Sequence, residues 1–125
     1  GVIAIFTNLL LAGKQPTIFG NGKQTRDYVY VKDVVEANIL AMEKGDNEAF
    51  NIGTKVEVDV NKLFSTLKEL TGYTGLPIYA PARAGELLKS CLDNSKAKNL
   101  LGWQPRYSLK DGLRETIEWV KALEK

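Results

Sequence analysis

Histidine is absent from the 125-residue sequence, and there is a single cysteine, Cys91. Without histidine, triads that use an imidazole base and most zinc-ligand sets are excluded. One cysteine cannot form an internal disulfide, so a reducing compartment fits, and we expect a cytoplasmic protein. Since no imidazole is available to activate it, Cys91 is expected to be a small buried apolar residue rather than a nucleophile.

Several catalytic and cofactor motifs are also missing. The sequence has no G-x-G-x-x-G fingerprint, P-loop or nucleophile elbow, so it cannot by itself hold a dinucleotide in the usual way. Tyr28 and Lys32 have the Tyr-x-x-x-Lys spacing of a catalytic pair that requires a helix. Residues 28–31 are instead β-prone, and four steps along a strand separate two side chains by roughly 13 Å. We therefore expect no catalytic residue, cofactor-binding residue or metal ligand in this chain.

Neither a long apolar run nor an excess of one charge is present. The apolar run over residues 2–12 is interrupted by Thr7 and Asn8 and is too short to cross a bilayer. The 17 basic and 15 acidic side chains are interleaved, so we expect neither a membrane nor a nucleic-acid partner. The chain begins with Gly1 inside a periodic segment, and we expect it to be a fragment of a longer protein.

The spacing of apolar residues predicts helices and a few short strands. Caps are expected at Asp33, Asp59 and Ser95, with a capping box at Ser108 and Asp111, and Gly102 ends the fourth helix. Trp103 and Trp119 are expected in core or lid packing. The predicted helices cover residues 2–13, 33–44, 60–71 and 96–101 and a last stretch to Leu123, and extended segments cover 49–53 and 76–79.

Residues 16–34 are the most informative run. Asn21-Gly22 lies between the β-prone segments 17–19 and 28–31, which predicts a hairpin with a type I′ turn. The five donors of the Arg26 guanidinium suit a phosphate or a carboxylate. The alternative is a surface hairpin in which Arg26 pairs with Asp27 or Asp33.

A second arginine lies in the predicted loop 81–86. Arg26 and Arg83, on separate loops, could clamp a diphosphate, and Glu86 could accept hydrogen bonds from sugar hydroxyls. The alternative for Arg83 is a solvated loop charge.

The predicted strand 49–53 and the helix behind it have the order of a parallel-sheet repeat. A parallel strand needs neighbours. The strand therefore pairs locally, or its sheet lies in sequence outside this chain.

Four ordered segments carry a resemblance: residues 18–34, 50–53, 81–86 and 93–103. Together they resemble the C-terminal half of the extended short-chain dehydrogenases, most closely the NAD-dependent UDP-glucose 4-epimerases. The resemblance implies an α/β fold, the C-terminal part of a Rossmann-type protein. Residues 1–125 would form one small mixed α/β substrate-binding region, in which one strand–helix unit, residues 49–72, docks on an N-terminal NAD-binding domain.

The resemblance also implies roles for individual residues. Lys55 and Asp59 depart from the family pattern, which more often has glycine and a small hydroxyl residue there. The backbones of four residues would line the uridine pocket: Val2, Ile3, Ile18 and Phe19. Arg26, with Tyr28 beside it, and Arg83 would bind the diphosphate from two sides. Glu86 would contact the ribose or sugar hydroxyls.

The implied activity belongs to the whole enzyme. The family's NAD loop and catalytic Ser or Thr, Tyr and Lys lie upstream of Gly1, so this chain alone should be inactive. The whole enzyme, expected to be a homodimer, would interconvert UDP-glucose and UDP-galactose in galactose metabolism. Two alternatives remain: part of a nucleotide-sugar dehydratase or decarboxylase, and a non-catalytic module that binds a nucleotide sugar or a protein.

Overall fold

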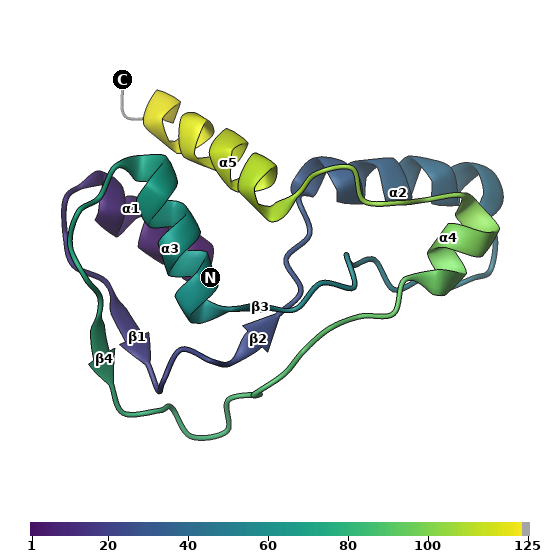
Figure 1. Ribbon diagram of the computed structural model, residues 1–125. Coiled ribbons are helices and arrows are strands. Elements are labelled where there is room, and N and C mark those ends of the chain that lie inside the picture. The colour runs from purple at the N-terminus through teal and green to yellow at the C-terminus, as the bar shows by residue number, and fades with distance from the viewer. Residues whose placement is uncertain (124–125) are drawn as a thin grey trace.

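The computed structural model describes residues 1–123 and has the mixed α/β architecture expected from the sequence (Figure 1). The helices α1, α3 and α5 form one group, and α2 and α4 lie together on the other side of the molecule. The elements in chain order are α1 Val2–Leu11, β1 Thr17–Phe19, β2 Thr25–Arg26, α2 Val31–Lys44, β3 Val58–Asp59, α3 Val60–Thr71, β4 Ile78–Ala80, α4 Ser95–Leu101 and α5 Leu109–Leu123. No helix within residues 1–123 is both long and apolar enough to cross a membrane.

The larger core lies between α1, α3 and α5. Leu63 and Leu67 of α3 are fully buried, which confirms the apolar face predicted from their spacing. Phe6 and Leu10 of α1 and Ile117 of α5 pack in the same cluster. The helices, rather than a large sheet, therefore provide most of the buried apolar surface.

A smaller cluster joins α2 to α4. Its centre is Trp103, which is fully buried as predicted, with Ala37 and Ala97 beside it. Two of the related predictions are wrong: Trp119 is 63% exposed on α5, and Cys91 is exposed rather than buried. The residues after Cys91 lie along the surface until Asn94, so the thiol has no core to enter.

The predicted hairpin is not formed. Strand β1 pairs in parallel with β4, and β2 pairs antiparallel with β3. The segment 28–30 has no strand, and Val31 begins α2. The turn is held by α3 instead, because Asn61 donates its backbone N–H to the carbonyl oxygen of Gly22 and its side-chain amide to that of Asn21. Gly22 has φ +74°, and a Cβ there would overlap the Asn61 side chain.

Residues 49–53 form no strand within residues 1–123, so local pairing of the predicted strand is wrong, and its pairing with a sheet outside this chain stays a prediction. A parallel strand requires a neighbour with which to pair, and within residues 1–123 nothing pairs with this segment. Phe50 and Ile52 pack against the Trp103 cluster, and Asn94 donates from Nδ2 to the carbonyl oxygen of Gly53 at 2.8 Å. The prediction of an extended segment over residues 76–79 is partly confirmed, because the strand β4 covers only Ile78–Ala80. It is an edge strand, which pairs with β1 on one side within residues 1–123.

Local capping signals at helix termini are largely confirmed. Asp59 accepts from the backbone N–H of Lys62 at 2.6 Å, and the Ser108 hydroxyl accepts from that of Asp111 at 3.1 Å. Gly102 ends α4 in the left-handed conformation. The prediction for Ser95 is wrong, since it lies inside α4 and the carboxylate of Asp93 accepts from its N–H at 2.9 Å.

Asp33 does not cap α2, because that helix begins two residues earlier. Its carboxylate is buried and accepts from the backbone N–H groups of Arg106, at 2.9 Å, and Tyr107, at 3.2 Å. Its backbone oxygen accepts from Nε1 of Trp103 at 2.8 Å. Asp33 therefore joins α2 to the segment that leads into α5, the link between the two clusters.

Replacement of Asp33 tests this link. Asp33→Ala leaves two partly buried N–H groups without their acceptor, and hydrogen bonds to a charged group contribute about 1.5–3 kcal/mol each. We expect the free energy of unfolding, measured with urea, to fall by at least about 2 kcal/mol. Asp46→Asn, on an exposed loop, should change it by less than about 0.5 kcal/mol. Equal stability of Asp33→Ala and the unchanged chain would contradict the assignment.

Candidate functional site

A cavity of about 580 Å³ opens between α1, β1, β2 and the loop that follows β4. Its volume lies within the range of small-molecule sites, which is about 300–1,000 Å³. The lining combines apolar side chains with a few charged ones. We call it the arginine cavity, and its lining residues are Gly1, Val2, Ile5, Phe6, Leu9, Gln15, Thr17, Ile18, Phe19, Gln24, Arg26, Tyr28, Val60, Arg83 and Glu86.

The structure brings most of the predicted site residues together in this cavity. Arg26 and Arg83, which are distant in sequence, line the same space. Ile3 does not line it and faces a smaller cavity. The predicted residues in the arginine cavity are Val2, Ile18, Phe19, Arg26, Tyr28, Arg83 and Glu86.

Arg26 is held by carbonyl oxygens rather than by a close carboxylate. Its Nη1 donates to the backbone oxygens of Thr25, at 2.6 Å, and Leu87, at 2.8 Å. Glu86 approaches Nη2 at 3.9 Å, with both side chains 31% exposed. Neither Asp27 nor Asp33 pairs with Arg26, so the simple surface-hairpin alternative is wrong. The loose contact with Glu86 leaves Arg26 able to bind an anion.

Arg83 lies on the face of an aromatic ring. Its Cζ is 4.0 Å from the centroid of the Phe19 ring. A guanidinium over a phenyl ring is stabilised by about 0.5–1 kcal/mol at an exposed site, and its N–H groups remain able to donate at its edge. Two guanidinium groups and one carboxylate, that of Glu86, give the cavity an excess of positive charge.

Tyr28 lines the cavity beside Arg26 and is half-buried. Its hydroxyl is buried and has no hydrogen-bond partner within residues 1–123. Burial raises the pKa of the Tyr28 phenol, and the nearby charge of Arg26 opposes this rise. The phenol is therefore neutral at pH 7.

Two glutamines extend the site beyond the predicted residues. Gln24 is buried and donates from Nε2 to the carbonyl oxygen of Phe19 at 2.9 Å, which fixes the end of β1. Gln15 donates to the carbonyl oxygen of Leu76 at 2.7 Å. Neither glutamine belongs to a motif, and their roles depend on backbone groups that only the fold brings near.

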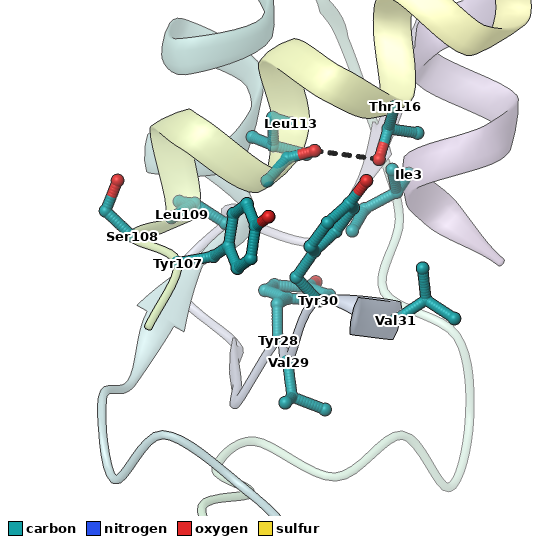
Figure 2. Close-up of a pocket in the computed structure, with 11 residues that line it drawn as sticks. Ile3, Tyr28, Val29, Tyr30, Val31, Tyr107, Ser108, Leu109, Leu113 and Thr116 are labelled. Atoms are coloured by element: carbon teal, nitrogen blue, oxygen red, sulfur yellow. Dashed lines mark hydrogen bonds between the residues drawn. The ribbon is translucent and has the colours of Figure 1, made fainter. Parts of the chain in front are cut away.

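A smaller cavity of about 150 Å³ lies between α5 and the segment before α2 (Figure 2). The rings of Tyr30 and Tyr107 meet there with centroids 4.6 Å apart, and Ile3 lies behind them. None of the described residues that line it is charged. Tyr28 lies before α2 and Lys32 lies within it, so the two residues do not share a helix. Lys32 pairs with Glu115 at 3.5 Å. Tyr28 and Lys32 are therefore not a catalytic pair, although the strand predicted over residues 28–31 is absent.

Residues 1–123 form neither a dinucleotide cradle nor a metal-ligand group. A dinucleotide cradle has a glycine turn between a strand and a helix N-terminus. Here the turn with Gly20 and Gly22 leads from β1 to β2, and no helix begins directly behind it. Within the described residues there is no group of three or more Cys, Asp or Glu side chains suited to a metal. The two guanidinium groups instead suit the arginine cavity to an anion.

Comparison with known proteins identifies the family. The sequence profile described as GDP-mannose 4,6 dehydratase matches residues 2–116. A putative UDP-glucose 4-epimerase of Methanocaldococcus jannaschii is 46% identical over 121 residues, which are 97% of this chain and 39% of the relative. The crystal structure of a Thermotoga maritima UDP-glucose 4-epimerase with UDP-glucose superposes with a TM-score of 0.97 at 55% identity, over 100% of this chain and 40% of that one.

The structure of MoeE5 with UDP-glucuronic acid and NAD is similar as well, with a TM-score of 0.90 and 34% identity over 98% of this chain and 42% of the other. The chain thus spans about two fifths of the length of the proteins it matches. Profile and relatives agree along nearly all of it. The chain belongs to the NAD-dependent epimerase/dehydratase family of extended short-chain dehydrogenases.

Proposed function

We propose that this chain is the UDP-sugar-binding part of a UDP-glucose 4-epimerase that interconverts UDP-glucose and UDP-galactose. The observation that carries the proposal is the meeting of Arg26 and Arg83 in one cavity. The Thermotoga maritima relative, 55% identical, was crystallised with UDP-glucose, which supports the same ligand class here.

The parts of the cavity match the parts of such a ligand. Arg26 and Arg83 hold the diphosphate from two sides, with Tyr28 beside Arg26. Glu86 accepts from ribose or sugar hydroxyls, which also turns its charge away from the phosphates. The uracil lies against the backbones of Ile18 and Phe19, with those of Val2 and Ile3 nearby. The chain thereby binds and orients the sugar nucleotide.

The redox chemistry belongs to a dinucleotide-binding part that these residues do not form. NAD, when bound by that part, would accept and return the hydride of the sugar. This chain contributes affinity and orientation, and by itself it is expected to be inactive.

One exposed surface supports docking on such a part. Along α2, four apolar side chains recur on one face at spacings of three and four: Val31, 63% exposed, Val35, 50%, Ile39, 53%, and Met42, 82%. Contiguous exposed apolar surface is typical of an interface. The extended segment 49–53 packs against the same cluster as α2 and has no pairing strand. In the proposed arrangement, residues 49–72 and this face contact the dinucleotide-binding part.

Substitution of each arginine tests the diphosphate assignment. We expect Arg26→Ala and Arg83→Ala each to weaken UDP binding by about tenfold or more, since each loses a charged hydrogen bond. Calorimetric titration measures the dissociation constant, and circular dichroism verifies folding. Arg114→Ala, on the outer face of α5, is the matched control and should leave binding unchanged. Unaltered affinity in both cavity variants would contradict the assignment.

Competition between nucleotides tests the substrate class. We expect UDP to bind more tightly than dTDP or GDP, and UDP-glucose more tightly than UDP-glucuronate. Tighter binding of dTDP or GDP would favour a dehydratase, in keeping with the description of the matching profile. A preference for UDP-glucuronate would favour a decarboxylase. A folded chain that binds none of these would favour a non-catalytic module.

The exposed face of α2 predicts self-association of the isolated chain. Sedimentation should show an apparent mass that rises with concentration, because association covers the apolar side chains. Ile39→Lys should reduce the association, whereas Lys44→Ala, at the end of the same helix, should not reduce it. A monomer at every concentration would contradict the docking surface.

A further inference from the structure

The segment 81–92, here called the strap, carries Arg83 and Glu86 into the arginine cavity. It contains no helix or strand, and residues 81–89 are all exposed. Packing of buried apolar side chains therefore does not fix its position. Apart from the contact of Arg83 with the Phe19 ring, the strap is held by hydrogen bonds, and their locations determine where its two charged side chains stand.

These hydrogen bonds converge on three consecutive residues. The backbone N–H of Thr25 donates to the carbonyl oxygen of Leu88 at 2.8 Å, and Nη1 of Arg26 donates to that of Leu87 at 2.8 Å. The backbone N–H of Leu92 contacts Oδ2 of Asp27 at 3.4 Å, and Sγ of Cys91 lies 3.8 Å from the same oxygen. Asp27 thus holds the far end of the strap.

The same carboxylate holds a second segment. Thr54 donates to Oδ1 of Asp27 from its hydroxyl at 2.6 Å and from its backbone N–H at 2.9 Å, and Lys55 donates its N–H to Oδ2 at 3.0 Å. Gly53 lies against this group, since a Cβ there would be 2.7 Å from Oδ2 and 3.0 Å from Cβ of Leu92. Burial raises the pKa of Asp27, but hydrogen bonds from Thr54, Lys55 and Leu92 outweigh it, so the pKa is lowered and the group is ionised at pH 7.

We propose that Asp27 is a positioning residue for the arginine cavity: its carboxylate fixes the strap and the 54–55 turn on one side of β2, so that Arg83 and Glu86 face Arg26 on the other. This inference rests on the proposed function. Successive side chains of an extended segment point to opposite sides, which lets neighbouring residues serve the ligand and the support. Asp27 itself does not line the cavity.

The first experiment measures the strap without any nucleotide. Asp27→Asn keeps the size of the side chain but replaces one acceptor oxygen with a donor that faces other donors. Hydrogen exchange should become at least about tenfold faster at the backbone N–H of Thr25, which donates to Leu88 of the strap, with no change in the core of α3. Unchanged exchange at Thr25, or an equal acceleration in α3, would overturn the proposal. This measurement is independent of whether UDP is the ligand.

The second experiment connects the support to the ligand. Asp27→Asn should weaken UDP binding by about five- to tenfold, and in combination with Arg83→Ala the two losses should not add, because Asp27 acts through the position of Arg83. Asp46→Asn is the control and should leave UDP affinity unchanged. Unaltered affinity in Asp27→Asn, or full additivity with Arg83→Ala, would overturn the positioning role. Absence of UDP binding in the unchanged chain would instead overturn the proposed function.

A conservative pair keeps the test valid if Asp27→Asn fails to fold. Thr54→Val removes the hydroxyl that donates to Asp27, and Thr54→Ser retains it. We expect Thr54→Val to accelerate exchange at the backbone N–H of Thr25 and to weaken UDP binding about threefold, and Thr54→Ser to leave both values as in the unchanged chain. Equal behaviour of the two variants would contradict the proposal.

Discussion

The hydrogen bonding of β2 and the residue after it is the constraint on which the site depends. The strand has only two residues, Thr25 and Arg26, yet it pairs with β3 on one edge and contacts the strap on the other. A half-buried guanidinium needs fixed acceptors for its donors, and the carbonyl oxygens of Thr25 and Leu87 provide them. Because Leu87 belongs to the strap, the position of Arg26 and that of the strap are set together.

The helices could be predicted from the sequence because their signals are local. The apolar spacing of α3, its cap Asp59 and the glycine that ends α4 act within a few residues of one another. The strands could not be predicted in the same way. The partner of β1 is β4, about sixty residues later, and no local signal in residues 16–34 indicates that pairing. The Asn-Gly pair predicts a hairpin from local pattern alone, whereas the residue that holds this turn, Asn61, lies in a helix that follows much later.

The residues of the candidate site divide in a similar way. Arg26, Arg83 and Glu86 stand in recognisable motifs, and their meeting in one cavity follows from the pairing of β1 with β4, which brings the strap beside β2. Gln24 and Asp27 carry no motif of their own, since each binds groups that are distant in sequence. The sequence indicates that Asp33 matters but not what it does. A helix N-cap and a buried hydrogen-bond acceptor both call for a short carboxylate side chain, so the residue type alone cannot distinguish the two roles.

Lys55 illustrates how a departure from the family pattern is accommodated. Its φ is +65°, in the left-handed region that favours glycine, the residue that the resemblance implies more often at this position. A lysine in this conformation costs about 1 kcal/mol or more. Its Nζ donates to the hydroxyl of Ser95 at 2.9 Å and lies 3.4 Å from the carboxylate of Asp93, contacts that a glycine could not make.

The link made by Asp33 has a consequence for evolutionary change along the chain. The groups that its carboxylate binds at positions 106 and 107 are backbone N–H groups, not side chains. Either position can accept almost any amino acid without loss of the link, whereas proline, which has no N–H, would remove it. Across distant relatives, the connection between α2 and α5 can therefore persist while the residues around it diverge, so long as one aspartate remains and one residue type is avoided.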